Sequence, residues 1–208
     1  MNLYADADRA VKEMNRLNLK LFGKLKLSRW DELNVIRNVS DTYDQSARFA
    51  RRMYFDIAVN ACGVALREAG TRRERVRELV DDTITAVWLL NVLDSPDPVT
   101  MYSFDAETAR KKQRLTEALA VASNRNLEID KALRNWTRQV AQYADNMVPM
   151  ARLEAFEAVG VEAVRWVSQD DNKVCADCNG LDGRIFTLDE LPQLPQHYHC
   201  RCYVIPAF

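Results

Sequence analysis

The chain has 208 residues, of which 48% are hydrophobic and 28% are charged, and its formal net charge is −1. This balance is ordinary for a soluble globular protein, and the near-neutral charge argues against a protein that coats nucleic acid over its whole surface. Glycine and proline number only six each, which favours long helices over a many-turned β-sandwich. No apolar stretch is long enough to cross a bilayer, because the longest candidate, Ile84 to Leu93, is interrupted by Thr85 and Asn91.

The N-terminal segment predicts an amphipathic helix. Apolar residues recur at spacings of three and four from Leu3 to Leu21, and Gly23 is expected to end the helix. This helix could be an arm that binds a partner, although apolar stripes of this period usually pack on a core. A short second helix is predicted over residues 28–37, with Ser28 as its N-cap.

A longer helix is predicted from Ser40 to Ala69, ending at Gly70. Its inner stripe is expected to consist of Phe49, Met53, Ile57, Ala61 and Val64. Cys62 lies in this helix, and we expect it to be a small buried hydrophobe, not a ligand.

The residues after Gly70 predict another helix. Thr71 and Glu74 have the spacing of a capping box. The inner face is expected to carry Val76, Val80, Ile84, Val87 and Leu90. The first turn is rich in arginine, which is compatible either with phosphate contact or, more commonly, with a solvated face.

The segment Asp94 to Pro98 is the clearest break, because two prolines one residue apart cannot continue a helix. We therefore expect an N-terminal helical region over residues 1–94, a second helical part over 99–165 and a Cys/His-rich module over 166–208. The basic run Arg110 to Arg114 could contact DNA, but it contains no aromatic residue that would stack on bases, so a surface helix is favoured.

The most regular helical stripe in the chain precedes the C-terminal module. It consists of Ile129, Leu133, Trp136, Val140, Tyr143 and Met147. Pro149 is expected to separate this helix from a short one that ends at Gly160. Short strands are predicted at 164–167, 184–186 and 203–205, and a one-turn helix with its own capping box at Thr187 to Glu190.

The last 34 residues hold four of the five cysteines and both histidines. Cys175 and Cys178 form a C-x-x-C pair, Asn179-Gly180 and Asp182-Gly183 follow as turn material, and a C-x-C pair returns after a stretch of zinc-ribbon length. Soft sulfur and imidazole ligands at such spacing favour tetrahedral zinc. The favoured ligand set is Cys175, Cys178, His197 and Cys200, with Cys202 as the alternative ligand and His199 as a further candidate.

Disulfides and free thiols are the alternatives to a metal. Residues 1–21 show no signal peptide, which points to synthesis in a reducing cytosol and against disulfides. The module is also too poor in apolar residues to fold easily alone, so a metal would act as its core. Four protein ligands would make a closed, structural zinc site, whose charge Arg184, Arg201 and Lys173 could offset.

The C-terminal pattern resembles a known family. The string W-V-S-x-x-D-x-x-V-C-x-x-C-x-x-L-D-G-x-x-F, followed by P-x-x-P-x-H-x-x-C-R-C, is similar to the terminal motif of the phage Mu protein F-like family, also called SPP1-type head morphogenesis or minor capsid proteins. The matching positions are Trp166, Asp171, Cys175, Cys178, Asp182, Gly183, Phe186, Pro195, His197, Cys200, Arg201 and Cys202. The resemblance extends more weakly over the preceding helical part, from about residue 95.

This resemblance implies a minor head protein that acts in head morphogenesis, binds the portal and influences DNA packaging or ejection. It implies the portal, capsid and scaffold proteins as partners, in the virion head or in the host cytoplasm during assembly, without secretion, a membrane or a small-molecule substrate. The expected fold is mainly α, an elongated helical body with a small zinc-knuckle-like α+β module at the C-terminus.

Two other classes of function remain open. A metal-dependent nuclease could use His197 and His199, but such chemistry needs an open metal position, which a closed site does not offer, so we expect no enzyme. An adaptor could use the zinc knuckle to bind DNA or protein, and steep salt dependence would identify DNA binding of that kind.

Overall fold

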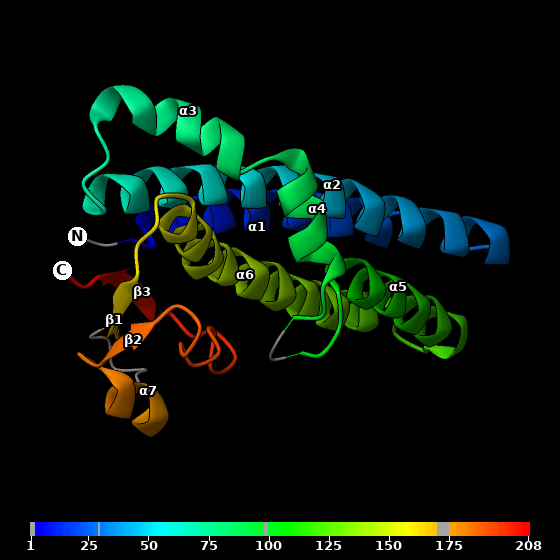
Figure 1. The fold of residues 1–208 in the computed structure, drawn as a ribbon. Coiled ribbons are helices and arrows are strands. Elements are labelled where there is room, and N and C mark those ends of the chain that lie inside the picture. Colours follow the sequence, from blue (N-terminus) through cyan, green and yellow to red (C-terminus); the bar gives the residue numbers. More distant parts are fainter. Residues whose placement is uncertain (1–2, 29, 98–99, 170–174) are drawn as a thin grey trace.

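The computed structural model describes residues 3–28, 30–97, 100–169 and 175–208, except for the side chain of Glu32. Figure 1 shows an elongated helical body with a small α+β module at one end, which confirms the predicted fold class. In the described residues the helices are α1 (Ala5–Lys26), α2 (Glu32–Glu68), α3 (Arg73–Thr83), α4 (Ala86–Asp94), α5 (Phe104–Val121), α6 (Arg125–Ala158) and α7 (Ala176–Leu181). The strands are β1 (Ala163–Val167), β2 (Ile185–Thr187) and β3 (Tyr203–Pro206).

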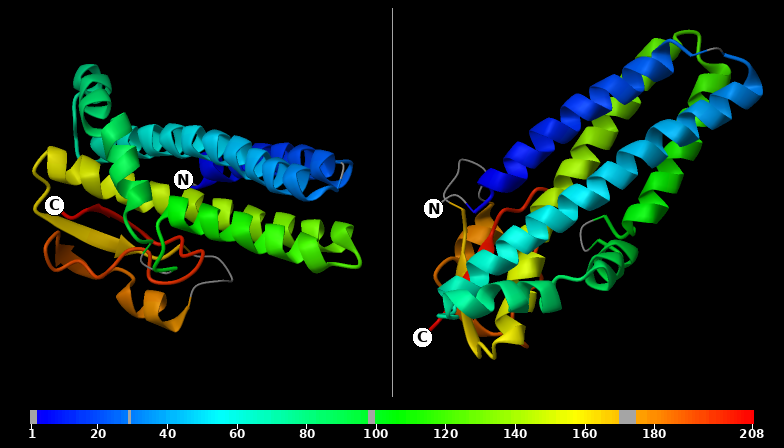
Figure 2. Two further views of the ribbon diagram at one scale, coloured as in Figure 1. Left: turned by 90° about the vertical axis from the view of Figure 1, so that its right-hand side faces the viewer. Right: turned by 90° about the horizontal axis from the view of Figure 1, so that it is seen from above.

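Four long helices form the body. Helices α1 and α2 are joined at the end far from the module, as are α5 and α6, while α3 and α4 cross over between the two pairs (Figure 2). Buried aromatic rings hold the bundle together, with Tyr43 meeting Phe22 and Trp136 edge to face and Phe104 meeting Tyr54 and Tyr143 in the same way. Such pairs add to the stabilisation from apolar burial. The N-terminal and C-terminal helices thus share one hydrophobic core.

The N-terminal helices are longer than predicted. Helix α1 continues through Gly23 to Lys26, because a single helical glycine costs only about 1 kcal/mol and the next turn buries Leu25. The two helices predicted over 28–69 are one helix of 37 residues, capped by Asp31 and not by Ser28. Ser28 instead donates to the carbonyl oxygen of Lys24 at the end of α1.

The inner stripe predicted for α2 is wrong at one position, because Phe49 is 51% exposed. The end of α2 at Gly70, whose φ is +79°, is confirmed. Cys62 is fully buried, as expected.

The single helix predicted after Gly70 is two helices. Helix α3 ends at Thr83, and the side chain of Thr85 starts α4 by accepting a hydrogen bond from the amide of Trp88. The change of axis leaves Val87 and Leu90 65% and 50% exposed, so they do not continue the buried face of Val76 and Val80. The capping box predicted at Thr71 and Glu74 is absent as well. Arg72 is the N-cap of α3, and no side chain accepts a hydrogen bond from the first amides of this helix.

Helix α6 runs without a break from Arg125 to Ala158 and contains Pro149, which corrects the predicted boundary there. Proline removes one backbone hydrogen bond, and the buried turns on both sides of it pack against α1 and α2 strongly enough to continue the helix. The predicted stripe is confirmed, since Ile129, Trp136, Val140 and Met147 are fully buried.

The predicted strands form one antiparallel sheet in the order β2-β1-β3. Val164 faces Phe186 on one side, and Trp166 faces Val204 on the other. Thr187 ends β2, and Leu188 to Glu190 form a turn instead of a one-turn helix. Asn179 and Gly180 lie in α7 instead of in a turn. Among the described residues, no helix has the length and apolar character to span a membrane.

Candidate metal centre

The cysteines of the terminal module converge into two overlapping groups. The ligand atoms of Cys175, Cys178 and His197 lie within 4.8 Å of one another, and so do those of Cys178, Cys200 and Cys202. Cys178 belongs to both groups and is fully buried. None of the five cysteines, all in the described residues, forms a disulfide. This cluster could hold a metal ion.

Local backbone structure places the first two thiols. Cys175 is the N-cap of α7, and its sulfur accepts a hydrogen bond of 3.4 Å from the amide of Cys178. The C-x-x-C spacing thus puts both sulfurs at the start of one short helix, close to its amide groups. Cys200 and Cys202 enter from the segment that leads into β3.

The spacing of the sulfurs suits tetrahedral coordination. The sulfurs of Cys178 and Cys200 are 3.8 Å apart. Two sulfurs bound to one zinc ion at bond lengths of about 2.3 Å and a tetrahedral angle would be about 3.8 Å apart. The donor set, rich in thiols with one imidazole, is the set that zinc prefers. The residues present therefore fit the metal that the sequence implies.

The histidine is oriented to contribute a ligand atom. The Nδ1 atom of His197 lies 3.1 Å from the carbonyl oxygen of Tyr198, so Nδ1 carries the proton and donates it. That tautomer leaves the lone pair of Nε2 for a metal, the arrangement in which histidine ligands are usually held.

The thiols influence one another's ionisation. Hydrogen bonding from the Cys202 thiol lowers the pKa of Cys200 to about 5, and the same interaction raises the pKa of Cys202. Burial raises the pKa of Cys178 to about 12. Metal ligands must be thiolates, so metal binding must release the protons that these thiols still carry.

The favoured set of Cys175, Cys178, His197 and Cys200 stays a prediction, as does Cys202 as its alternative. The structure places Cys200 with Cys178 and Cys202, and His197 with Cys175 and Cys178. Asp171 and Lys173, which the motif and the charge argument invoked, lie outside the described residues.

Arg201 was expected to offset the charge of the zinc site and His199 to be a candidate ligand, but both contact the helical body instead. Arg201 pairs with Asp145 at 3.0 Å and with Asp8 at 2.5 Å, and its guanidinium group lies over the ring of Tyr4. The Nδ1 atom of His199 lies 3.1 Å from Asp145. These contacts connect the module to both α1 and α6.

Gln142 supports the same junction. Its side-chain oxygen accepts a hydrogen bond of 2.5 Å from the amide of His199, a residue with a φ of +57°. Gln142 and Asp145 are buried polar residues of α6 that sequence reasoning missed as structural partners. The available signal was the spacing of three between them, which places both on one face of the helix.

A second connection is made by Arg152, which is fully buried in α6. Its Nε and Nη2 atoms donate to the carbonyl oxygen of Val204 at 3.1 and 2.7 Å, and it also pairs with Glu68 of α2. β3 is an edge strand, and Val204 lies on it. Arg152 therefore joins the open edge of the sheet to the helical body.

The basic run from Arg110 to Arg114 is largely neutralised by ion pairs. Arg110 and Lys111 pair with the buried carboxylate of Glu107, and Lys112 pairs with Asp44 of α2. These pairs fit a surface helix that packs on its neighbour, the alternative favoured from the sequence.

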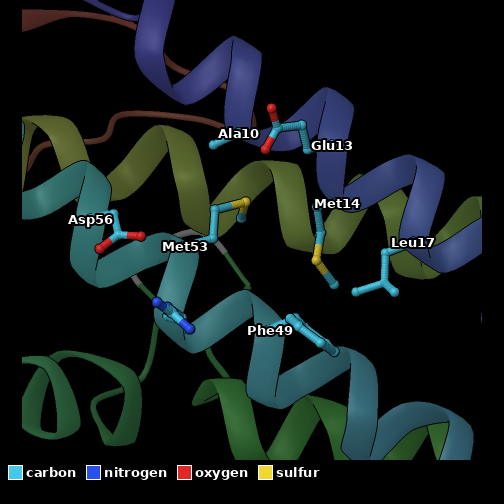
Figure 3. Close-up of a pocket in the computed structure, with 8 residues that line it drawn as sticks. Ala10, Glu13, Met14, Leu17, Phe49, Met53 and Asp56 are labelled. Atoms are coloured by element: carbon cyan, nitrogen blue, oxygen red, sulfur yellow. The ribbon is translucent and has the colours of Figure 1, made fainter.

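The helical body carries a separate groove of about 370 Å³ between α1 and α2. Met14 and Leu17 of α1 and Phe49 and Met53 of α2 border it (Figure 3). Charged residues, Glu13, Arg52 and Asp56, line its other parts. Helix α1 is packed on α2 and α6 over its length and is not a free arm.

Comparison with protein families gives one finding. Residues 108–205 match the family model described as Phage Mu protein F like protein. The match includes α6, the sheet except for the last residue of β3, and the four cysteines of the terminal cluster, and it confirms the resemblance seen in the terminal motif. No curated protein and no solved structure matches the chain significantly.

Proposed function

Because residues 108–205 match the family of phage Mu protein F like proteins, we propose that this chain is a minor head protein that acts in head morphogenesis. The family match is the observation that carries the proposal. The structure supports it, since a stiff helical body with a small, firmly docked module suits a component that joins other proteins in an assembly. Capsid proteins, the scaffold and the portal are the partners we propose, in the host cytoplasm during assembly and in the virion head.

We propose a structural zinc ion in the cysteine cluster, with Cys178 as the ligand common to every set. A bound zinc ion would supply folding free energy to a module that buries few apolar side chains. The protein would hold the ion with the amide of Cys178 and the carbonyl of Tyr198 positioning two of the ligand side chains.

A zinc measurement tests this directly. Native mass spectrometry of the reduced protein should show one zinc per chain. Cys178→Ser should lose the ion, whereas Cys62→Ser, a buried cysteine in α2, should keep it. A fully folded module without zinc in the unchanged protein would refute the site.

The portal is the partner we propose first, and the groove between α1 and α2 is the surface where we place the contact. The groove presents one half-exposed apolar side chain, Phe49, beside the nearly buried Met14 and Met53. Its charged margin would add specificity.

Co-expression with the portal protein of the same genome, followed by size-exclusion chromatography, tests this contact. Phe49→Asp should dissociate the complex, while Val87→Asp, at an exposed apolar position on α4, should not. If the unchanged protein and the portal elute apart at every salt concentration, the portal contact is wrong. The capsid and scaffold proteins are then the next partners to test.

No observation favours a nuclease. His197 belongs to the thiol cluster, and His199 is held by Asp145, so neither is placed to activate water beside an open metal position. We therefore propose that the chain is not an enzyme.

A further inference from the structure

We propose that the corner between α2 and α3 is a binding site for a phosphate group, supplied either by the DNA backbone or by free orthophosphate. The corner lies where the chain leaves the end of α2 and turns into α3 (Figure 1). The inference goes beyond head assembly and does not depend on the family match, which begins after this corner.

Three arginines line one hollow at this corner. The hollow measures about 700 Å³, and its lining consists of Arg67, Thr71, Arg73, Val76 and Arg77. The lining includes no acidic residue, and none of the three arginines forms an ion pair with any residue in the described part of the chain. Elsewhere in the molecule, basic side chains such as Arg152 and Lys112 do have carboxylate partners.

The packing of α3 on α2 brings these guanidinium groups together. Arg73 and Arg77 are one helical turn apart on α3 and flank the buried residues Val76 and Val80. The side chain of Arg67 runs from α2 past Gly63 toward α3. A Cβ atom built on Gly63 would lie 3.6 Å from both Arg67 Nη1 and Val80 Cγ2, so the guanidinium group lies close to α3. The convergence therefore arises from tertiary structure, because the residues come from two helices.

The backbone adds to the positive potential. Helix α3 begins at Arg73, and no side chain caps its first amide groups. Free amides at a helix N-terminus favour an anion, and Thr71 provides a hydroxyl group beside them. Guanidinium groups bind phosphate oxygens in pairs of hydrogen bonds, so phosphate matches this set of donors.

The charges around the hollow limit what can bind. Glu74, Glu78, Asp81 and Asp82 are exposed residues of α3 that do not line the hollow, although Asp81 lies one helical turn beyond Arg77. They would repel a polyanion that covered the whole helix, so the site can hold one or two phosphates of a strand that crosses the corner. This local contact is consistent with the net charge of −1.

Fluorescence anisotropy with a short labelled DNA duplex at about 50 mM salt tests the site, because binding that depends on phosphate contacts weakens steeply as salt is raised. The triple variant Arg67→Ala, Arg73→Ala, Arg77→Ala should bind at least about tenfold more weakly. Its slope of log K against log salt should be shallower by about 0.9 for each phosphate that the variant no longer neutralises. Arg75→Ala is the matched control, since Arg75 lies on the same helix but not in the lining.

A second arm separates the two sources of phosphate. Amide NMR shifts of Thr71, Arg73 and Glu74 are followed during titration with sodium phosphate, with sodium chloride as the control. Saturable shifts without DNA binding assign the site to free phosphate, and DNA binding that the triple variant loses assigns it to the DNA backbone.

Several results would overturn the proposal. These are an unchanged response of the triple variant, equal weakening by Arg75→Ala, or binding of polyglutamate in place of both phosphate ligands. Circular dichroism confirms that each variant is folded. Because portal capture is measured separately, failure of this site leaves the proposed head-assembly function untouched, and failure of portal capture leaves this site untouched.

Discussion

Replacing Arg152 with methionine should detach the edge of the C-terminal sheet from the helical body. Methionine keeps the apolar stem of the side chain but removes the donors to Val204 and the pairing with Glu68. A buried carbonyl left without a partner costs about 1–3 kcal/mol. Glu68 is 28% exposed, so water can replace much of its lost ion pair with Arg152. Loss of that pair therefore costs only about 0–1 kcal/mol.

The sum is a loss of about 1–4 kcal/mol in the free energy of unfolding, and each kcal/mol lowers Tm by about 2–4 °C in a chain of this size. Thermal and urea unfolding followed by circular dichroism measure the loss, and hydrogen exchange at β3 locates it. Arg165→Met, at an exposed position on β1, is the control and should change Tm very little. If Arg152→Met changes Tm no more than this control does, and β3 keeps its exchange protection, Arg152 does not hold the sheet on the helical body.

Three further outcomes are expected. Cys178→Ser should make the terminal module sensitive to limited proteolysis while α2 and α6 keep their helical signal, and Cys62→Ser should leave the module resistant. Burial raises the pKa of Tyr43 and Tyr54, so above about pH 10 the unfolded chain loses protons that the folded chain keeps, and stability falls by about 1.4 kcal/mol per pH unit for each tyrosine. Alkaline titration of the tyrosinate absorbance checks this prediction. If Tyr43 and Tyr54 ionise near pH 10 while the chain is still folded, the prediction is wrong. Trp88→Phe should cost about 1 kcal/mol in urea unfolding, because it removes the 3.0 Å indole hydrogen bond that holds α4 on α6.

Local pattern was enough to predict the mainly helical fold, the strands and the convergence of the cysteines. The stripe from Ile129 to Met147 repeats over five turns, so its buried face follows from helical periodicity alone. The C-x-x-C pair sits on one short helix, so its two sulfurs meet by local geometry. The terminal motif also carried enough matching positions to predict the family model that residues 108–205 match.

Helix boundaries could not be predicted in the same way, because they depend on partners that are distant in sequence. Gly23 and Pro149 are local helix breakers, yet both lie inside helices whose flanking turns are buried against other helices. Tertiary packing outweighs the cost of about 1–3 kcal/mol that each residue imposes on an isolated helix.

The polar junctions were decided by tertiary structure alone. Asp145 and Arg152 would be solvated on a lone helix, and they are buried because the sheet and α1 cover the end of α6. The arginine hollow likewise exists only because α3 folds back on α2. A sequence determines which chemical groups are available and which of them share a helical face, whereas contacts between groups on different elements depend on how the whole chain packs.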